Sequence, residues 1–290
     1  MKFYGQFDPP VDQFIFERYF PDKNIQGVSV ECGAFDGLIE SSCKFFEESM
    51  GWKVYNIEPV PWIFESLCKN RPHSQNLNFG LSDINSNVSF NQAISPILGR
   101  DFGNGSIGHA PTHLKSLEES GCTFEEINIK VVTWREFVIR QGITHVDLLV
   151  LDVEGHELAV IAGMRGCDVL PNVICVEFGH IGLSVIRDCL AVLDYLYDIT
   201  SNGNAYFVQN NVIGLFALRR AATSPIHQKH TQIAPREPFL EEENQTLQRR
   251  LDELTGIYKE LTGIYTNIVH SKGWRAIEAL RSVKTRLFKK

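Results

Sequence analysis

The sequence has no run of eighteen consecutive apolar residues, so it offers no segment that would span a membrane as a helix. Its first residues, MKFYGQFDPPVDQF, also lack the apolar stretch of a signal peptide, and we therefore expect a cytoplasmic protein. The seven cysteines are scattered, and none forms a C-x-x-C pair. This pattern favours buried free thiols in a reducing compartment.

Charge is distributed unevenly along the chain. Residues 271–290 hold seven lysines and arginines against one glutamate, although the whole chain has a net charge of −7. The acidic remainder argues against general nucleic-acid binding. The basic tail predicts contact with an anionic surface or partner.

Strand and helix patterns alternate through residues 1–220. The predicted strands are 27–33, 53–58, 77–83, 127–134, 145–153 and 172–179, with two more in 204–219 about a turn at Asn210-Asn211. The predicted helices are 38–50, 60–70, 156–164 and 184–198, and residues 92–123 show no clear pattern. Near-continuous apolar strands between helices predict an α/β domain whose parallel sheet is covered on both faces. A closing pair of strands indicates the methyltransferase variant of the Rossmann-like fold.

The stretch VSVECGAFDGLIESS, residues 28–42, is a predicted strand that breaks on glycines and restarts as a helix. Glu31, Gly33 and Gly37 are spaced E-x-G-x-x-x-G, so a carboxylate stands where the dinucleotide fingerprint needs its first glycine. A carboxylate there would repel a pyrophosphate but suits the cationic amine of S-adenosylmethionine. The glycines would let the backbone approach the ligand closely. On this stretch alone, a glycine-rich turn that binds nothing fits equally well.

A second acid, Glu58, ends the next predicted strand twenty-five residues after Gly33. An acid at this position can bind both ribose hydroxyls of an adenosine. Two acids at the carboxyl ends of adjacent strands favour a cofactor site over a surface loop.

Further acidic residues follow the later strands. Asp152 ends the strand 145–153 and Glu154 follows it, whereas Glu177 and His180 come at the end of the next strand. Because the carboxyl ends of parallel strands meet at one edge, these four side chains should converge. They predict either a general base with its orienting groups, His180 being one candidate base, or a metal site formed by Asp152, Glu154 and Glu177. The sequence leaves both alternatives open.

Taken together and in order, the motifs GAFDG, EPVP, FGLSD, GNGSIG and LDVEGHE resemble the FkbM family of S-adenosylmethionine-dependent methyltransferases. The resemblance covers residues 3–219. It implies a class I methyltransferase fold, with a mostly parallel seven-stranded sheet and an antiparallel closing hairpin, and methylation of a hydroxyl group, often on a sugar. Two features depart from the family pattern: Glu31 replaces the commoner aspartate, and Thr133-Trp134-Arg135 replaces T-L-D.

The resemblance also implies roles for individual residues. Gln6 would cap the cofactor pocket, Asp83 would lie near adenine and Asp152 near the methyl group. Ser106 and His109 are expected to face the acceptor, and Asp152, Glu154 and His180 to carry catalysis. The full set expected to bind S-adenosylmethionine is Gln6, Glu31, Gly33, Ala34, Gly37, Glu58, Pro59, Ser82, Asp83 and Asp152.

The tail lies outside this resemblance. Residues 221–238 hold three prolines and form a predicted linker. From Leu240 to Ile268 apolar residues recur in alternating steps of four and three, which predicts a coiled coil within residues 239–270 and self-association through 240–268. Residues 271–290 form a predicted basic amphipathic helix, suited either to an anionic membrane or to an acidic protein.

The sequence therefore predicts an O-methyltransferase that acts on a sugar hydroxyl of a bacterial surface glycan, such as an O-antigen or capsule, at the cytoplasmic membrane face. Its partners would be the glycan or another hydroxyl-bearing acceptor, a second copy of the chain and an anionic membrane surface, without nucleic acid. Two alternatives remain: a non-catalytic scaffold subunit of a glycan-assembly complex, and a nicotinamide oxidoreductase, which Glu31 disfavours.

Overall fold

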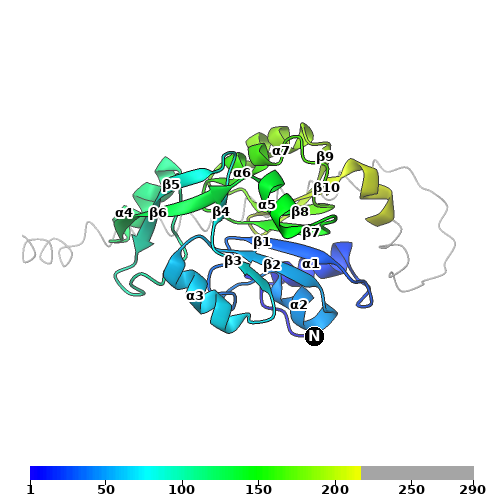
Figure 1. Cartoon of the computed structure of the whole chain (residues 1–290), viewed down its shortest axis with the longest axis horizontal. Coiled ribbons are helices and arrows are strands. Elements are labelled where there is room, and N and C mark those ends of the chain that lie inside the picture. Colours follow the sequence, from blue (N-terminus) through cyan, green and yellow to red (C-terminus); the bar gives the residue numbers. More distant parts are fainter. Residues whose placement is uncertain (217–290) are drawn as a thin grey trace, which may run out of the picture. The chain divides into compact units, whose positions relative to one another are not determined.

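A seven-stranded sheet forms the centre of the computed structural model, which describes residues 1–216 (Figure 1). Its strand order is β3-β2-β1-β7-β8-β10-β9, and only β10 pairs antiparallel with its neighbours. This confirms the predicted mostly parallel sheet with an antiparallel end. The strands are β1 (Val28–Cys32), β2 (Lys53–Ile57), β3 (Gln75–Leu77), β7 (Leu148–Leu151), β8 (Val173–Glu177), β9 (Tyr195–Ser201) and β10 (Asn204–Gln209).

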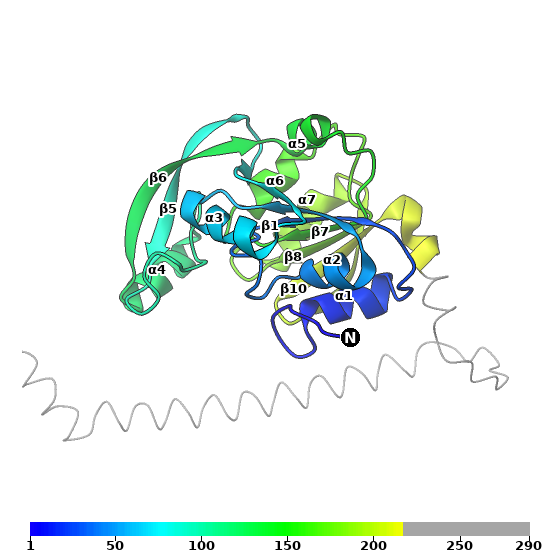
Figure 2. The same cartoon turned by 60° about the horizontal axis from the view of Figure 1, so that its bottom comes forward.

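Helices cover both faces of the sheet (Figure 2). One face packs against α5 (Trp134–Gln141), α6 (Glu157–Gly163) and α7 (Leu183–Ala191), and the other against α1 (Val11–Tyr19) and α2 (Lys44–Met50). Strand β7 shows why: Leu149 and Leu151 join the first cluster, whereas Leu148 and Val150 join the second. Side chains of a strand alternate between faces, so a strand that is apolar throughout requires cover on both.

A second, three-stranded sheet lies beside α3 (Pro61–Asn70). Its order is β4-β6-β5, with β4 (Gly80–Leu81), β5 (Ser86–Ile94) and β6 (Thr123–Val132). The helix α4 (Pro111–Glu119) lies between β5 and β6 in the chain and begins with proline at its first position. The sequence predicted no clear structure for most of this region.

The predicted strand 77–83 is divided between the two sheets. Gln75–Leu77 pairs with β2, and Gly80–Leu81 pairs with β6. Between them, the side-chain amide of Asn78 donates hydrogen bonds to the carbonyls of Glu58 and Pro59, at 2.9 and 3.1 Å. These bonds hold the chain where it leaves the main sheet.

The predicted closing strands were placed wrongly. The hairpin consists of β9 and β10 and turns at Asn202-Gly203, where both residues have positive φ, +49° and +83°. An Asn-Gly pair is the strongest short signal for such a turn. Asn210–Val212 is instead a short 3-10 turn, and the predicted helix 184–198 ends at Ala191.

Two other boundaries moved for local reasons. The predicted helix 38–50 begins only at Lys44, and the predicted strand 127–134 spans Thr123–Val132. Thr133 ends that strand because its Oγ1 accepts a hydrogen bond from the backbone N–H of Glu136, which caps α5.

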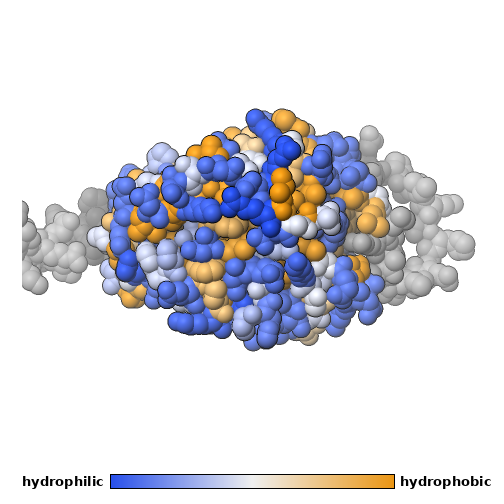
Figure 3. All heavy atoms as spheres, viewed as in Figure 1, coloured by the Kyte–Doolittle hydropathy of each residue, from blue (hydrophilic) through white to orange (hydrophobic). Residues whose placement is uncertain are grey.

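The outer surface is mixed in character. On the face seen in Figure 3, hydrophobic residues form separate patches among hydrophilic ones. Within the described residues, every helix is too short or too polar to cross a bilayer. The predicted linker, coiled coil and basic helix lie outside those residues.

Candidate functional site

A cavity of about 410 Å³ opens at the carboxyl ends of β1, β2 and β7. Its lining includes Gly33, Glu58, Asp152 and Glu154 from the loops of the main sheet, together with Phe90 and Asn104 from the second sheet and the segment that follows β5. The volume lies within the range of roughly 300–1,000 Å³ that small-molecule sites occupy. The cavity is at the edge where an open α/β sheet binds its ligands.

Gly33 lies where the loops after β1 and β7 touch. Its φ is +87°, and a Cβ at this position would come 1.8 Å from the carbonyl oxygen of Asp152. The backbone N–H groups of Gly33 and Ala34 both donate to the carbonyl of Ile57 at 3.1 Å. Only glycine allows the two loops to approach this closely.

Glu58 presents a carboxylate to the cavity. Its Oε1 accepts a hydrogen bond from the backbone N–H of Val60 at 2.8 Å, and its Oε2 accepts one from Phe35 at 3.2 Å. Burial raises the pKa of Glu58 to about 8, while the two backbone donors act in the opposite direction. Adjacent Pro59 also lines the cavity. This arrangement fixes one carboxylate in place and leaves its remaining lone pairs free for a ligand.

Glu31 has different partners from those expected of a ligand-binding residue. Its Oε2 accepts from the hydroxyl of Ser41 at 2.7 Å, and its Oε1 accepts from the backbone N–H groups of Ser42 and Cys43 at 2.6 and 3.2 Å. Burial raises the pKa of Glu31, and the charge of Arg71 opposes the shift. Its neighbour Cys32, not Glu31, lines the cavity. Glu31 therefore holds the segment that precedes α2 and delays the start of that helix.

The other residues predicted to bind cofactor are not in the lining of the cavity. Gln6 is exposed, and Gly37 adopts a positive φ of +73° against α3. The hydroxyl of Ser82 contacts Asp83 Oδ1 at 3.1 Å and His156 Nε2 at 3.0 Å. Of these three side chains, His156 lines the cavity. The structure therefore brings four of the predicted residues into the cavity lining: Gly33, Glu58, Pro59 and Asp152. Six are outside the lining: Gln6, Glu31, Ala34, Gly37, Ser82 and Asp83.

Acidic side chains converge at the ends of β7 and β8. Asp152 and Glu177 follow paired residues of the neighbouring strands β7 and β8 and interact electrostatically. Asp152 is exposed to solvent where it lines the cavity. Burial, followed by the negative charges of Glu177 and Glu157, raises the pKa of Asp152. Burial, followed by the charge of Asp152, likewise raises the pKa of Glu154.

Glu154 also has an unusual backbone conformation. Its φ is +55°, in the left-handed backbone region that residues other than glycine and asparagine seldom adopt. Such strain concentrates at functional sites, where the surrounding structure maintains it. The conformation directs the Glu154 carboxylate to His180, whose Nε2 lies 3.1 Å from Glu154 Oε2 and 3.8 Å from Glu177 Oε2.

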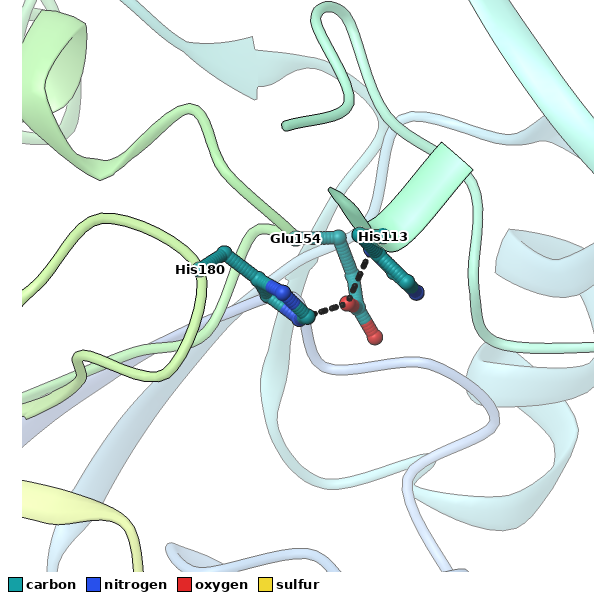
Figure 4. A group of neighbouring side chains, drawn as sticks. All are labelled: His113, Glu154 and His180. Carbon is teal, nitrogen blue, oxygen red and sulfur yellow. Dashed lines mark hydrogen bonds and ion pairs between the residues drawn. The ribbon is translucent and has the colours of Figure 1, made fainter. Parts of the chain in front are cut away.

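A third group at this end, His113 of α4, was not predicted from the sequence. Its Nδ1 lies 3.5 Å from Glu154 Oε2, and its ring stacks on that of His180 with centroids 4.0 Å apart (Figure 4). Burial lowers the pKa of His113 to about 4, so its ring is neutral near pH 7. A signal was present in HAPTH, where His109 and His113 stand four residues apart beside a helix-starting proline.

The residues predicted to face the acceptor support this histidine from behind. His109 packs edge-on against His113 at 5.3 Å, and its Nε2 lies 2.9 Å from the carbonyl oxygen of Asn104. Ser106 is fully buried, and its hydroxyl accepts from the backbone N–H of Gly108. Neither Ser106 nor His109 is in the cavity lining.

The described residues contain one trio suited to a metal ion: His113, Glu154 and His180, whose ligand atoms lie within 4.8 Å of one another. The trio predicted from the sequence was Asp152, Glu154 and Glu177. Only Glu154 is common to both. The trio in the structure therefore offers two imidazole nitrogens where the predicted trio offered two further carboxylates.

Comparison with known proteins identifies the family of this chain. The family model described as the methyltransferase FkbM domain matches residues 31–206. The hexuronic acid methyltransferase AglP of Haloferax volcanii is 31% identical over 134 residues, which cover 45% of this chain and 48% of that protein. The chain therefore matches about half the length of this relative.

Two solved structures are weaker matches. The methyltransferase FkbM of Methylobacillus flagellatus has 14% identity and a TM-score of 0.39, over 63% of this chain and 44% of that one. TrmK of M. capricolum, solved with S-adenosyl-homocysteine, has 9% identity and a TM-score of 0.36, over 71% and 67%. Neither is similar enough to bear on the chemistry of the cavity.

Proposed function

Because this chain belongs to the FkbM family of S-adenosylmethionine-dependent methyltransferases, we propose that it is an O-methyltransferase whose acceptor is a sugar hydroxyl of a surface glycan. The observation that carries the proposal is the cavity itself, which has the Glu58 carboxylate at one end and Asp152 and Glu154 at the other, with His180 against Glu154 behind the lining. One end suits a nucleoside, and the other suits proton transfer.

The residues at the first end fit the cofactor. Glu58 offers carboxylate lone pairs to the cavity, as binding of the two ribose hydroxyls requires. Gly33 provides backbone without a side chain where the loops after β1 and β7 meet. When bound, S-adenosylmethionine supplies a methyl group on a positively charged sulfur. Asp152, on the cavity wall, would place negative charge near that sulfur.

The second end supplies acid–base chemistry. A hydroxyl that accepts a methyl group must lose its proton, and a base is most effective when its pKa is near the working pH. Asp152 and His180 are the two candidates, because burial raises the pKa of Asp152 and Glu154 orients the His180 ring. Glu154 acts through His180 as a positioning residue.

The acceptor is proposed from the relative. AglP is named as a hexuronic acid methyltransferase, which supports a sugar as the acceptor here. We also retain the proposals for the tail: self-association through residues 240–268 and attachment through 271–290 to the cytoplasmic face of an anionic membrane. Their support is the sequence pattern alone.

The test uses the purified full-length chain. S-adenosylmethionine and a panel of glycans are supplied, and mass spectrometry follows the gain of a methyl group. Asp152→Asn and His180→Gln should each reduce turnover by roughly 10²–10⁴ if the residue is the base, with little change in cofactor affinity. Absence of both methyl transfer and S-adenosylhomocysteine binding would instead support the alternative of a non-catalytic scaffold subunit.

A further inference from the structure

We propose that His113, Glu154 and His180 bind a divalent first-row transition metal ion beside the cavity, whose lining includes Glu154 but not the two histidines. The three side chains come from separate parts of the chain: α4, the loop after β7 and the loop after β8. In Figure 4 the dashed lines join one carboxylate oxygen of Glu154 to both imidazole rings. Two imidazoles and one carboxylate form the donor set of many catalytic metal sites.

The distances fit a shared ion. Metal–ligand bonds of about 2.0–2.2 Å place two ligands of one tetrahedral or octahedral ion roughly 3.0–3.5 Å apart. Glu154 Oε2 lies 3.1 Å from His180 Nε2 and 3.5 Å from His113 Nδ1. The third pair, His113 Nδ1 and His180 Nε2, lies within 4.8 Å, and the two rings stack nearly parallel with centroids 4.0 Å apart. Binding of one ion by all three atoms therefore requires one imidazole ring to rotate out of the stack.

The protonation of His113 supports the same conclusion. Its Nε2 lies 3.2 Å from the amide oxygen of Asn104, an acceptor, so the ring proton resides on Nε2. Nδ1 then directs a lone pair at the Glu154 carboxylate. Within residues 1–216 no group forms a hydrogen bond with this nitrogen, although His113 is only 9% exposed. Two electron-rich atoms that face each other in a buried setting are stabilised by a cation between them.

Asn104 has the position of an outer-shell residue. Metal-bound histidines usually donate their second N–H to a carbonyl or carboxylate, which fixes the ring and its tautomer. Asn104 does this for His113 through its side chain, and its main-chain carbonyl accepts from His109. A single residue of the cavity wall therefore positions two histidines that pack edge-on against each other.

A bound metal ion would allow the acidic end of the cavity to bind the acceptor. Glu154 lines the cavity, so a bound ion would have open positions on that side. It could hold an oxygen of the acceptor and offset the charges of Asp152 and Glu177, which would otherwise repel a sugar carboxylate. This role rests on the proposed function, with Asp152 as the base because His180 would be a metal ligand, whereas metal binding itself does not rest on it.

Calorimetric titration of Co²⁺ into the metal-free full-length protein, with absorption spectra of the bound cobalt, tests the site without methyl transfer. The wild type should bind one ion that His113→Ala and Glu154→Gln each weaken by at least tenfold, while His145→Ala, at a surface histidine, changes nothing. Zn²⁺ should displace the cobalt, and Mg²⁺ should not.

Equal affinity and stoichiometry in the wild type, His113→Ala and Glu154→Gln would overturn the proposal. If His113→Ala fails to fold, Glu154→Gln decides, because it keeps the size of the side chain and changes only the ligand charge. Thermal unfolding of each variant confirms its fold. Metal binding without methyl transfer would leave this site standing and refute the proposed function. Methyl transfer by a protein that binds no metal would support the proposed function and refute the metal site.

Discussion

At the end of β2 the Glu58 carboxylate stands apart from other acids and accepts two backbone hydrogen bonds, whereas at the ends of β7 and β8 the carboxylates of Asp152, Glu154 and Glu177 crowd one another. At the first end, backbone N–H groups fix the position of the carboxylate. At the second end, neighbouring carboxylates raise one another's pKa values. A ligand that only needs to be held suits the first end, and chemistry that moves a proton suits the second.

The largest effect should follow from a change at Gly33, because both ends of the cavity depend on the close contact between Gly33 and the backbone of Asp152. Gly33→Ala places a Cβ 1.8 Å from the Asp152 carbonyl oxygen, and we expect a loss of about 3 kcal/mol or more in the free energy of unfolding. Gly142→Ala is the matched control, because Gly142 also has a positive φ, +61°, but no atom within 4 Å of the added Cβ. It should cost about 1 kcal/mol. Urea unfolding measures both, and equal losses would contradict the close-contact account.

The next effect separates two glutamates at neighbouring strand ends. At about pH 9, where the Glu58 carboxyl is ionised, Glu58→Gln should weaken S-adenosylhomocysteine binding by at least tenfold, because charge-assisted hydrogen bonds contribute about 1.5–3 kcal/mol each. Glu31→Gln should leave the affinity of the folded protein unchanged and lower its stability instead, since Glu31 accepts three hydrogen bonds from residues 41–43. Calorimetry and thermal unfolding distinguish the two. Weaker binding in Glu31→Gln without loss of stability would show that Glu31 contacts the cofactor.

A smaller effect concerns pH. The pKa of Glu58 is raised to about 8, so below that pH its carboxyl is mostly protonated and accepts ribose hydroxyls less well. Affinity for adenosine, which has no titrating amine, should therefore increase by up to roughly tenfold as pH rises from about 6.5 to 9. Glu58→Gln should show no such increase. A flat profile in the wild type would indicate that Glu58 is already ionised at neutral pH.

The same proton also affects stability. Between about pH 4.5 and 8 the folded protein retains a proton on Glu58 that the unfolded chain releases, so folding weakens as pH rises through this range. The melting temperature of the wild type should fall between pH 6 and pH 9 by more than that of Glu58→Gln. Each kcal/mol corresponds to about 2–4 °C for a domain of this size. An equal fall in both proteins would assign the effect to the other buried acids.

Much of the fold could be predicted from the sequence because apolar strands and intervening helices leave a local pattern. Glu58 and Asp152 followed from their places at strand ends. Glu31 shows the limit of this reasoning: adjacent strand residues face opposite sides, and the sequence does not say which of the last two faces the cavity. The structure gives that place to Cys32.

His113 shows a different limit. It belongs to a segment without clear periodicity, and its position depends on pairing between β5 and β6, which brings α4 to the ends of β7 and β8. Such long-range pairing leaves little trace in the local sequence. The misplaced hairpin was avoidable, since Asn202-Gly203 is a stronger turn signal than Asn210-Asn211.

The central claim is that the Glu58 end of the cavity binds the methyl donor and the Glu154 end supports the chemistry. The most direct test is the rate of methyl transfer by Glu58→Gln and Glu154→Gln as donor concentration is raised. The two substitutions are chemically identical, and each removes one cavity-lining carboxylate. The account predicts that saturating S-adenosylmethionine restores most of the rate of Glu58→Gln but leaves Glu154→Gln slow at every donor concentration. Recovery of Glu154→Gln with excess donor, or a persistent defect in Glu58→Gln, would contradict it.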